Sequence, residues 1–242
     1  MNRFNKTCTD PGSVQVKKIP RKYQPKGFEI LYEDDEIIVG NKAFGYLTVG
    51  AMYERERTVQ HALNEYARKG NFRSHKRVYV VHRLDRETSG LLIFAKSEKA
   101  QVTLKDHWKD TVKTYYAVVH GRLNQKSGTI TSYLVENEDY TMHSAKDSKE
   151  GKLARTAYTV VRETVRFSLL KINLLTGRKN QIRVHLAGEG HPVVGDAKYG
   201  RHDTRYQRLA LHAQSISFPH PSTGERMTFE AGLPEYFHTL AA

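Results

Sequence analysis

Short strand-like segments recur along this chain, and few stretches between them have the apolar spacing of a helix. A hairpin is predicted with strands at 28–32 and 37–42, and helices are predicted to begin after Thr58 and after Ser97. Further strands are expected over 77–81, 90–96, 114–120, 129–135, 156–161, 168–174 and 215–218. Because strands and helices do not alternate regularly, we predict an α+β fold, a mainly antiparallel mixed sheet with helices packed on it.

The two predicted helices carry apolar stripes that we interpret as core faces. Gly70 is placed to end the first helix, after a stripe that includes Leu63. In the second, Ala100, Leu104 and Trp108 fall on one stripe.

The chain is strongly basic. Its 242 residues contain 39 Lys and Arg against 26 Asp and Glu, a formal net charge of +13, which favours a polyanionic partner such as nucleic acid.

No apolar stretch approaches the roughly 20 residues of a membrane span and no signal-peptide core is found, so we expect a cytoplasmic protein. Cys8 is the single cysteine, and the spacings of His82, His185, His191 and His212 match no familiar ligand pattern; we predict no metal site.

Periodicity begins only at Phe28. Residues 1–27 contain many lysines and arginines opposed by Asp10 alone, and such a stretch cannot bury enough apolar surface to order itself. We therefore expect a flexible basic arm over 1–27 and one folded domain over 28–242.

The run from Val81 to Lys96 is the candidate active site. It reads Val-His-Arg-Leu-Asp-Arg-Glu-Thr-Ser-Gly-Leu-Leu-Ile-Phe-Ala-Lys. Arg83 and Asp85, two positions apart, would put opposite charges on one side of an extended backbone where solvent need not reach them. Taken alone, each has a structural explanation: a single Asp after Leu is usually a turn or cap, and a single Arg usually faces solvent.

This run resembles the signature of the RluA family of RNA pseudouridine synthases. Further segments match that family in order, including Lys113-Thr114-Tyr115 for its Lys-x-Tyr strand and Gln181-Ile182-Arg183 within its second long signature. The matching segments are 29–42, 81–96, 113–121, 176–187, 190–200 and 208–213.

The resemblance implies an enzyme that isomerises uridine to pseudouridine in ribosomal or transfer RNA, without cofactor or metal, with 28–242 as its catalytic domain. Asp85 would be the catalytic carboxylate, ionised so that it can act as nucleophile or base, with Arg183 as its ion-pair partner. Tyr115 would lie against the target base. Arg83 would hold RNA or fill the space left by the extruded nucleotide, and Lys113 and Arg178 would contact RNA. We expect a monomer.

Two segments depart from the family pattern. Asn41-Lys42-Ala43-Phe44-Gly45 stands where Asn-Lys-Pro-Ala-Gly is common, and Arg178-Lys179-Asn180 stands where Arg-Thr-His is frequent. We interpret both as changes beside the site and not in it. The arm before Phe28 is too short for the S4 RNA-binding domain of some relatives.

Two other functions stay open. A non-catalytic RNA-binding or ribosome-assembly factor could keep this fold, although it would not need a buried carboxylate opposite polyanionic RNA. A hydrolytic nuclease or nucleosidase would require paired carboxylates with a metal or a general acid, and we assign one carboxylate, Asp85, to catalysis.

Overall fold

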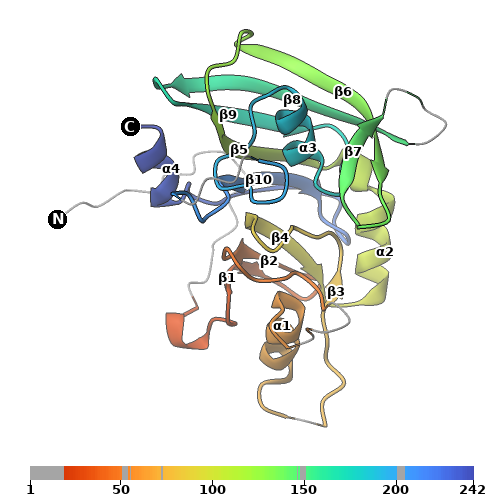
Figure 1. The fold of residues 1–242 in the computed structure, drawn as a ribbon. Helices are drawn as coiled ribbons and strands as arrows, with labels where there is room; N and C mark the ends of the chain where they lie inside the picture. Colours follow the sequence, from red (N-terminus) through yellow and green to blue (C-terminus); the bar gives the residue numbers. More distant parts are fainter. Residues whose placement is uncertain are drawn as a thin grey trace.

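A computed structural model describes residues 19–50, 54, 56–71, 73–145, 147, 151–200 and 205–242. In this part of the chain, eleven strands form one sheet, which Figure 1 shows with helices on its faces. The strands are β1 (Phe28–Glu33), β2 (Ile37–Lys42), β3 (Tyr79–Val80), β4 (Ser89–Ala95), β5 (Val112–His120), β6 (Ser127–Glu136), β7 (Met142–Ala145), β8 (Lys152–Glu163), β9 (Phe167–Leu174), β10 (Leu211–Pro219) and β11 (Arg226–Glu230). The helices are α1 (Val59–Arg68), α2 (Glu98–Asp106), α3 (Gln181–Gly188) and α4 (Glu235–Leu240), with 3-10 turns η1 (Arg21–Tyr23) and η2 (Trp108–Asp110).

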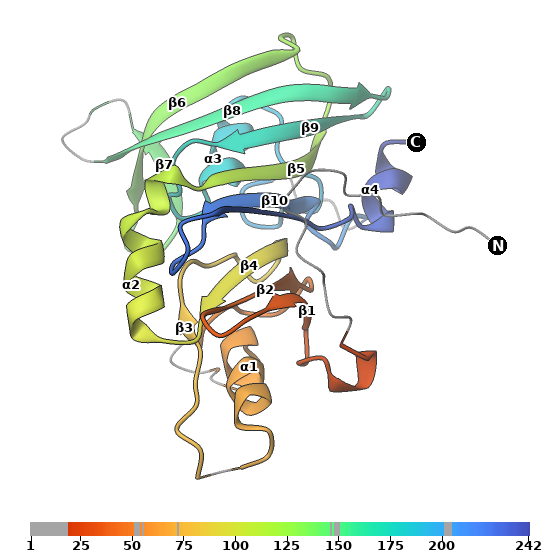
Figure 2. The same ribbon diagram turned by 180° about the vertical axis from the view of Figure 1, so that it is seen from behind.

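The sheet runs in the order β1-β2-β4-β10-β5-β9-β8-β6-β7, with β3 on β4 and β11 on β10. Among these strands β4 and β10 pair in parallel, and all other pairs are antiparallel. The predicted α+β fold with a mainly antiparallel mixed sheet is therefore confirmed. Figure 2 shows from behind how β10 lies between the β1–β4 half and the β5–β9 half.

The two halves of the sheet meet at a short parallel contact, where Gly90 of β4 pairs with Ala213 of β10. Gly90 has φ +119°, and a Cβ there would lie 2.3–2.7 Å from Ala213 backbone atoms, so the contact requires glycine. On its other edge Ala213 pairs with Tyr115 of β5. This register leaves only β10 between Tyr115 and β4, and hence places Tyr115 near the loop that precedes β4.

Strand β4 is buried along its whole length, because apolar clusters cover both faces of the sheet there. Leu92 and Phe94 join one cluster with α1, while Leu91 and Ile93 join the other with α2. A continuous apolar run is typical of a strand covered on both sides.

The predicted helix caps are confirmed. The Thr58 hydroxyl accepts from the His61 amide at the start of α1, and the Ser97 hydroxyl accepts from the Ala100 amide at the start of α2. Trp108 is not on the α2 stripe, however, because α2 ends at Asp106. It lies in η2, packs at the edge of the α2 cluster and lines surface cavities.

Part of the predicted arm packs on the domain. The Gln24 side chain accepts from the Ile30 amide at 2.7 Å and donates to the Ile19 carbonyl at 3.2 Å. Residues 1–18 lie outside the described residues, so the arm over 1–27 remains a prediction there.

None of the helices in the described segments is both long enough and apolar enough to cross a membrane.

Candidate active site

Asp85 lies in the loop between β3 and β4, and neighbouring segments hold the backbone of that loop. The Thr48 hydroxyl donates to the Leu84 carbonyl at 2.9 Å and accepts from the Leu84 amide at 3.1 Å. The Arg86 carbonyl accepts from the Gly45 amide at 2.9 Å and from Lys42 Nζ at 3.0 Å. Contacts on both sides of Asp85 therefore fix where its side chain starts.

Lys42 is fully buried, with its ammonium among backbone carbonyls. It donates to Ala43 at 3.0 Å and Tyr46 at 2.7 Å as well as to Arg86. Burial lowers the pKa of Lys42 to about 7, although the carboxylates of Glu87 and Asp85 act in the opposite direction.

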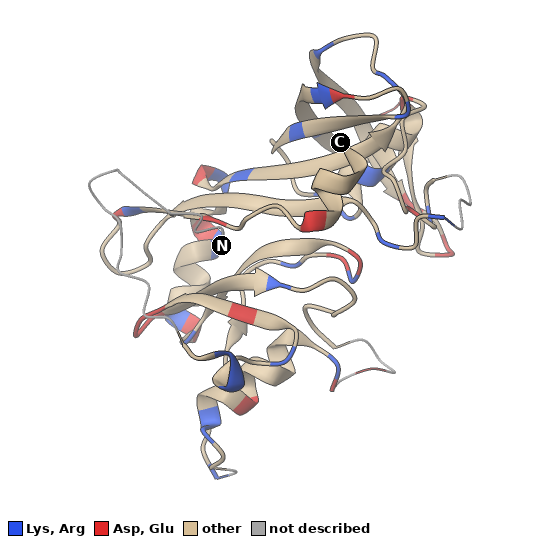
Figure 3. Ribbon diagram, turned by 90° about the vertical axis from the view of Figure 1, so that its left-hand side faces the viewer, with Lys and Arg blue, Asp and Glu red and all other residues tan. Residues whose placement is uncertain are grey.

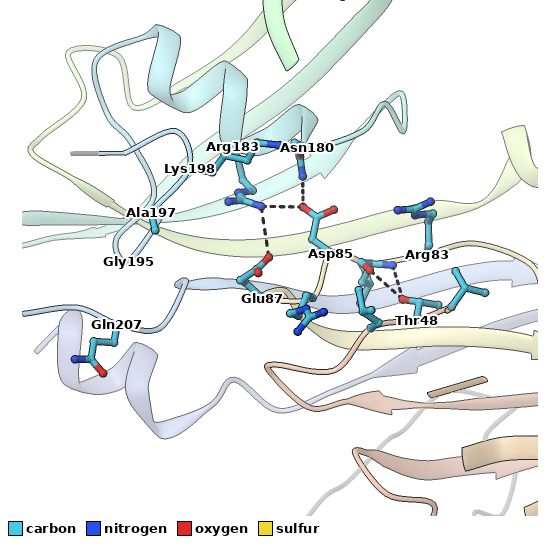
Figure 4. Close-up of a pocket in the computed structure, with 14 residues that line it drawn as sticks. Thr48, Arg83, Asp85, Glu87, Asn180, Arg183, Gly195, Ala197, Lys198 and Gln207 are labelled. Atoms are coloured by element: carbon cyan, nitrogen blue, oxygen red, sulfur yellow. Dashed lines mark hydrogen bonds and ion pairs between the residues drawn. The ribbon is translucent and has the colours of Figure 1, made fainter. Parts of the chain in front are cut away.

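One oxygen of the Asp85 carboxylate is held and the other is not. Oδ2 accepts from Arg183 Nη1 at 3.2 Å and from Asn180 Nδ2 at 2.5 Å, as Figure 4 shows. Among the described residues no hydrogen bond reaches Oδ1. The Asp85 side chain is 25% exposed, whereas that of Arg183 is 6% exposed. The carboxylate is thus oriented from the protein side and open on the solvent side.

Arg183 is fixed by a second, fully buried carboxylate. Its Nε and Nη2 donate to the two oxygens of Asp196 at 2.8 and 2.7 Å, and the Asp196 side chain is 0% exposed. The Lys198 and Tyr199 amides also donate to Asp196 Oδ1. Burial opposes the charge of Arg183, but the hydrogen bonds and charges of Asp196 and then Asp85 outweigh it and raise the pKa of Arg183. Arg183 is therefore a permanent cation.

Asn180 belongs to the site, which corrects its interpretation as a change outside it. It precedes α3 with φ 51°, and its side chain makes no cap hydrogen bond. Its Oδ1 instead accepts from the Tyr199 hydroxyl at 3.0 Å, and that hydroxyl accepts from the Met142 amide at 3.0 Å. This chain of contacts orients the amide so that Nδ2 faces Asp85.

Asp85, Arg183 and Tyr115 line one cavity of about 260 Å³, together with Lys113 and Arg178. Lys113 and Tyr115 share a face of β5, as their spacing predicts. Burial, and then the charge of Asp85, raise the pKa of Tyr115 above its ordinary value, so the phenol stays neutral.

A second cavity of about 360 Å³ lies against the same loop. It is lined by Asp85, Arg83, Glu87, Lys198 and other residues, and Figure 4 shows it. Arg83 lines both cavities and is exposed. The expectation that solvent does not reach this pair is wrong for Arg83, which is exposed, because both residues belong to a loop and not to a strand.

The four histidines singled out in the sequence make separate contacts. His185 bonds Ser132 and Thr156, and His212 bonds Ser89 at 2.8 Å. His82 Nε2 accepts from the Ile93 amide, and His191 bonds the carbonyl of His120. Within the described residues, no group of three or more His, Cys, Asp or Glu side chains is placed to hold a metal ion.

Asp196 and Asn180 were missed as site residues. Asp196 was visible as the single acid of its matched segment, in Gly195-Asp196-Ala197-Lys198, and a buried guanidinium requires such a partner. Asn180 had no comparable signal, because its contact with Asp85 spans 95 positions of the sequence.

Comparisons with known proteins identify the family of this chain. Residues 36–188 match the family described as RNA pseudouridylate synthase. An uncharacterised RNA pseudouridine synthase of Mycoplasma pneumoniae is 38% identical over 230 residues, covering 91% of this chain and 72% of the relative. The dual-specificity RNA pseudouridine synthase RluA of Vibrio vulnificus is 36% identical over 205 residues, covering 81% and 79%.

A solved structure shows the same fold. Human RNA pseudouridylate synthase domain containing 4 has a TM-score of 0.73 at 23% identity, covering 87% of this chain and 90% of that one. The matched segment includes both Asp85 and Arg183, and the relatives are enzymes of the same class. The chain therefore belongs to the RluA family of RNA pseudouridine synthases, the isomerases that convert uridine to pseudouridine in RNA.

Proposed function

We propose that Asp85 is the catalytic carboxylate of this isomerase and that the target is a uridine of ribosomal or transfer RNA. One observation carries the assignment: Oδ2 of Asp85 is held by Arg183 and Asn180 while Oδ1 has no hydrogen-bond partner among the described residues. A carboxylate held through one oxygen presents the other to a substrate in a fixed direction.

The reaction needs little from the protein besides that carboxylate. The bond from ribose C1′ to uracil N1 breaks, the base turns, C1′ joins C5, the proton on C5 leaves and N1 is protonated, so the atoms balance. Asp85 acts as nucleophile or base in this sequence of bond changes, and the permanent positive charge of Arg183 lies 3.2 Å from its Oδ2. Cofactor and metal independence remain predictions, as does the monomeric state.

Tyr115 would support the extruded base. Its neutral ring lines the cavity with Asp85, and stacking on an aromatic side chain stabilises an unstacked base by about 1–3 kcal/mol. A phenolate would put a second negative charge beside Asp85, and the raised pKa of Tyr115 prevents this.

RNA positioning would depend on particular cations near Asp85. Figure 3 shows Lys and Arg spread over many segments, with acidic residues between them. Arg83, Lys113 and Arg178 line the cavities around Asp85, so their phosphate contacts would set the register of the strand. Binding should weaken as salt rises.

The test is Asp85→Asn, with Asp106→Asn on the exposed side of α2 as control. We expect the Asp85 variant to bind RNA like the unaltered protein and to form no pseudouridine, which is detected as carbodiimide adducts that resist mild alkali. Equal activity in Asp85→Asn overturns the assignment. If the unaltered protein releases uracil or cleaves the RNA, the result would indicate a hydrolase. If it binds the RNA without changing it, the result would indicate an assembly factor.

A further inference from the structure

A groove of about 540 Å³ continues from the Tyr115 cavity across η2, the start of β5 and the turn before α3. We call it the Trp108 groove; its lining residues are Trp108, Lys109, Thr111, Val112, Lys113, Asn173, Leu174, Leu175, Thr176, Gly177 and Arg178. It shares five of them with the cavity that holds Asp85, namely Trp108, Lys113, Leu174, Gly177 and Arg178. An RNA strand that places one nucleotide in the cavity must continue over the adjoining protein surface, and the Trp108 groove is such a surface.

Trp108 lines both the cavity and the groove. Its ring lies 4.7 Å from that of His82, tilted by 35°, and His82 is tied to β4 because its Nε2 accepts from the Ile93 amide at 3.2 Å. The Lys113 ammonium lies 5.2 Å from the indole centroid. Two polar groups thus lie against the indole ring: the His82 imidazole, which is held in place, and the Lys113 ammonium, whose flexible stem can move when a phosphate offers it a new partner.

The charge of the groove suits a polyanion. Lys109, Lys113 and Arg178 line it, and none of its lining residues in the described part of the chain is acidic. Val112 and Leu175 also line the groove and are 54% and 52% exposed, so it offers apolar surface beside its cations. An aromatic ring with cations beside it is the combination that binds single-stranded nucleic acid through its bases and backbone.

We propose that the Trp108 groove binds the nucleotide next to the target uridine, with its base against the Trp108 indole and its phosphate between Lys113 and Arg178. This inference rests on the proposed function and identifies a second RNA subsite. Extruding the uridine removes a stacking partner from its neighbour, and the indole supplies a replacement. The subsite therefore favours the flipped state of the substrate.

Tryptophan fluorescence tests the contact directly, because Trp108 is the single tryptophan of the chain. The Asp85→Asn protein is titrated with a short single-stranded RNA that has one uridine, while the anisotropy of a dye on the RNA reports binding independently. We expect the indole emission to fall in step with binding. An emission that stays constant while anisotropy shows saturation overturns the proposal.

Trp108 variants combined with altered RNAs distinguish a stacking role of Trp108 from a purely structural one. Two RNAs carry an abasic residue on one side or the other of the uridine, and each is compared with the intact RNA on the unaltered, Trp108→Ala and Trp108→Phe proteins. We expect Trp108→Ala to raise KM for intact RNA about 10-fold with a smaller change in kcat, and Trp108→Phe to recover most of it. One abasic RNA should show the same loss on the unaltered protein and no further loss on Trp108→Ala.

Additive losses for both abasic RNAs would show that Trp108 acts only through the fold and would overturn the proposal. Lys113→Met should raise KM and reduce its salt dependence, whereas Lys105→Met on α2, outside the groove, should change neither. The two proposals can fail separately. An active Asp85→Asn protein would overturn the catalytic proposal alone, and an unchanged indole emission would overturn the groove proposal alone.

Discussion

The Asp85 loop is held from two sides in different ways. On the α3 side, Arg183 and Asn180 contact the carboxylate itself. On the β2 side, Lys42 and Thr48 contact only backbone atoms of the loop. The difference teaches that orientation of the carboxylate and placement of its backbone are separate tasks here, so loss of the Asn180 amide should reduce activity first and loss of a β2-side contact should reduce stability first.

Asp196→Asn should have the largest effect, because it removes the charge that holds Arg183 and leaves a buried guanidinium without its main partner. We expect the free energy of unfolding to fall by about 3–5 kcal/mol, measured by urea denaturation. The kcat should fall about 100-fold because Arg183 no longer holds Asp85 in place. The prediction would be contradicted if Asp196→Asn were as stable and as active as the exposed control Asp106→Asn.

Asn180→Gly sharpens the comparison on the α3 side, because glycine accepts the left-handed backbone of this position and removes only the amide. A lost hydrogen bond to a charged group corresponds to about a 10- to 100-fold lower kcat. The free energy of unfolding, measured by urea denaturation, should change by less than about 1 kcal/mol. Asn180→His, the residue frequent in the family, should restore part of the activity; a large stability loss in Asn180→Gly would contradict the separation of tasks.

Lys42→Met tests the β2 side of the loop through the pH dependence of the free energy of unfolding. The pKa of Lys42 is about 7 in the folded protein and ordinary in the unfolded chain, so between these values the unfolded chain binds more protons. The free energy of unfolding should therefore rise with pH above about 7, by at most about 1.4 kcal/mol per unit. Lys42→Met should lack this rise. Chemical denaturation of both proteins from pH 7 to 9.5 measures the difference; parallel curves would contradict the prediction.

Local patterns predicted the regular parts of the fold well. The β1–β2 hairpin, the Thr58 and Ser97 caps and the buried run of β4 depend on neighbours in sequence, where periodicity applies. Helix α3 had no such signal, because residues from Gln181 to Leu186 are all buried and no polar face marks it as a helix.

The site was predictable only in part for a similar reason. The resemblance supplied Asp85, Arg183 and Tyr115, which the structure brings to one cavity. Asn180 contacts Asp85 across 95 positions of the sequence, and Trp108 left its expected stripe because α2 ends at Asp106. Such contacts depend on tertiary packing, which no short window of sequence contains.

Gly90 gives the molecule a weak point that carries no functional group. Its missing side chain allows the two halves of the sheet to touch, and that touch sets the spacing between the aspartate on one half and the tyrosine on the other. A random screen for inactive clones would recover this position alongside the polar site residues. A substitution there would do harm by moving Asp85 away from Tyr115, although Gly90 itself lines neither of the two cavities at Asp85.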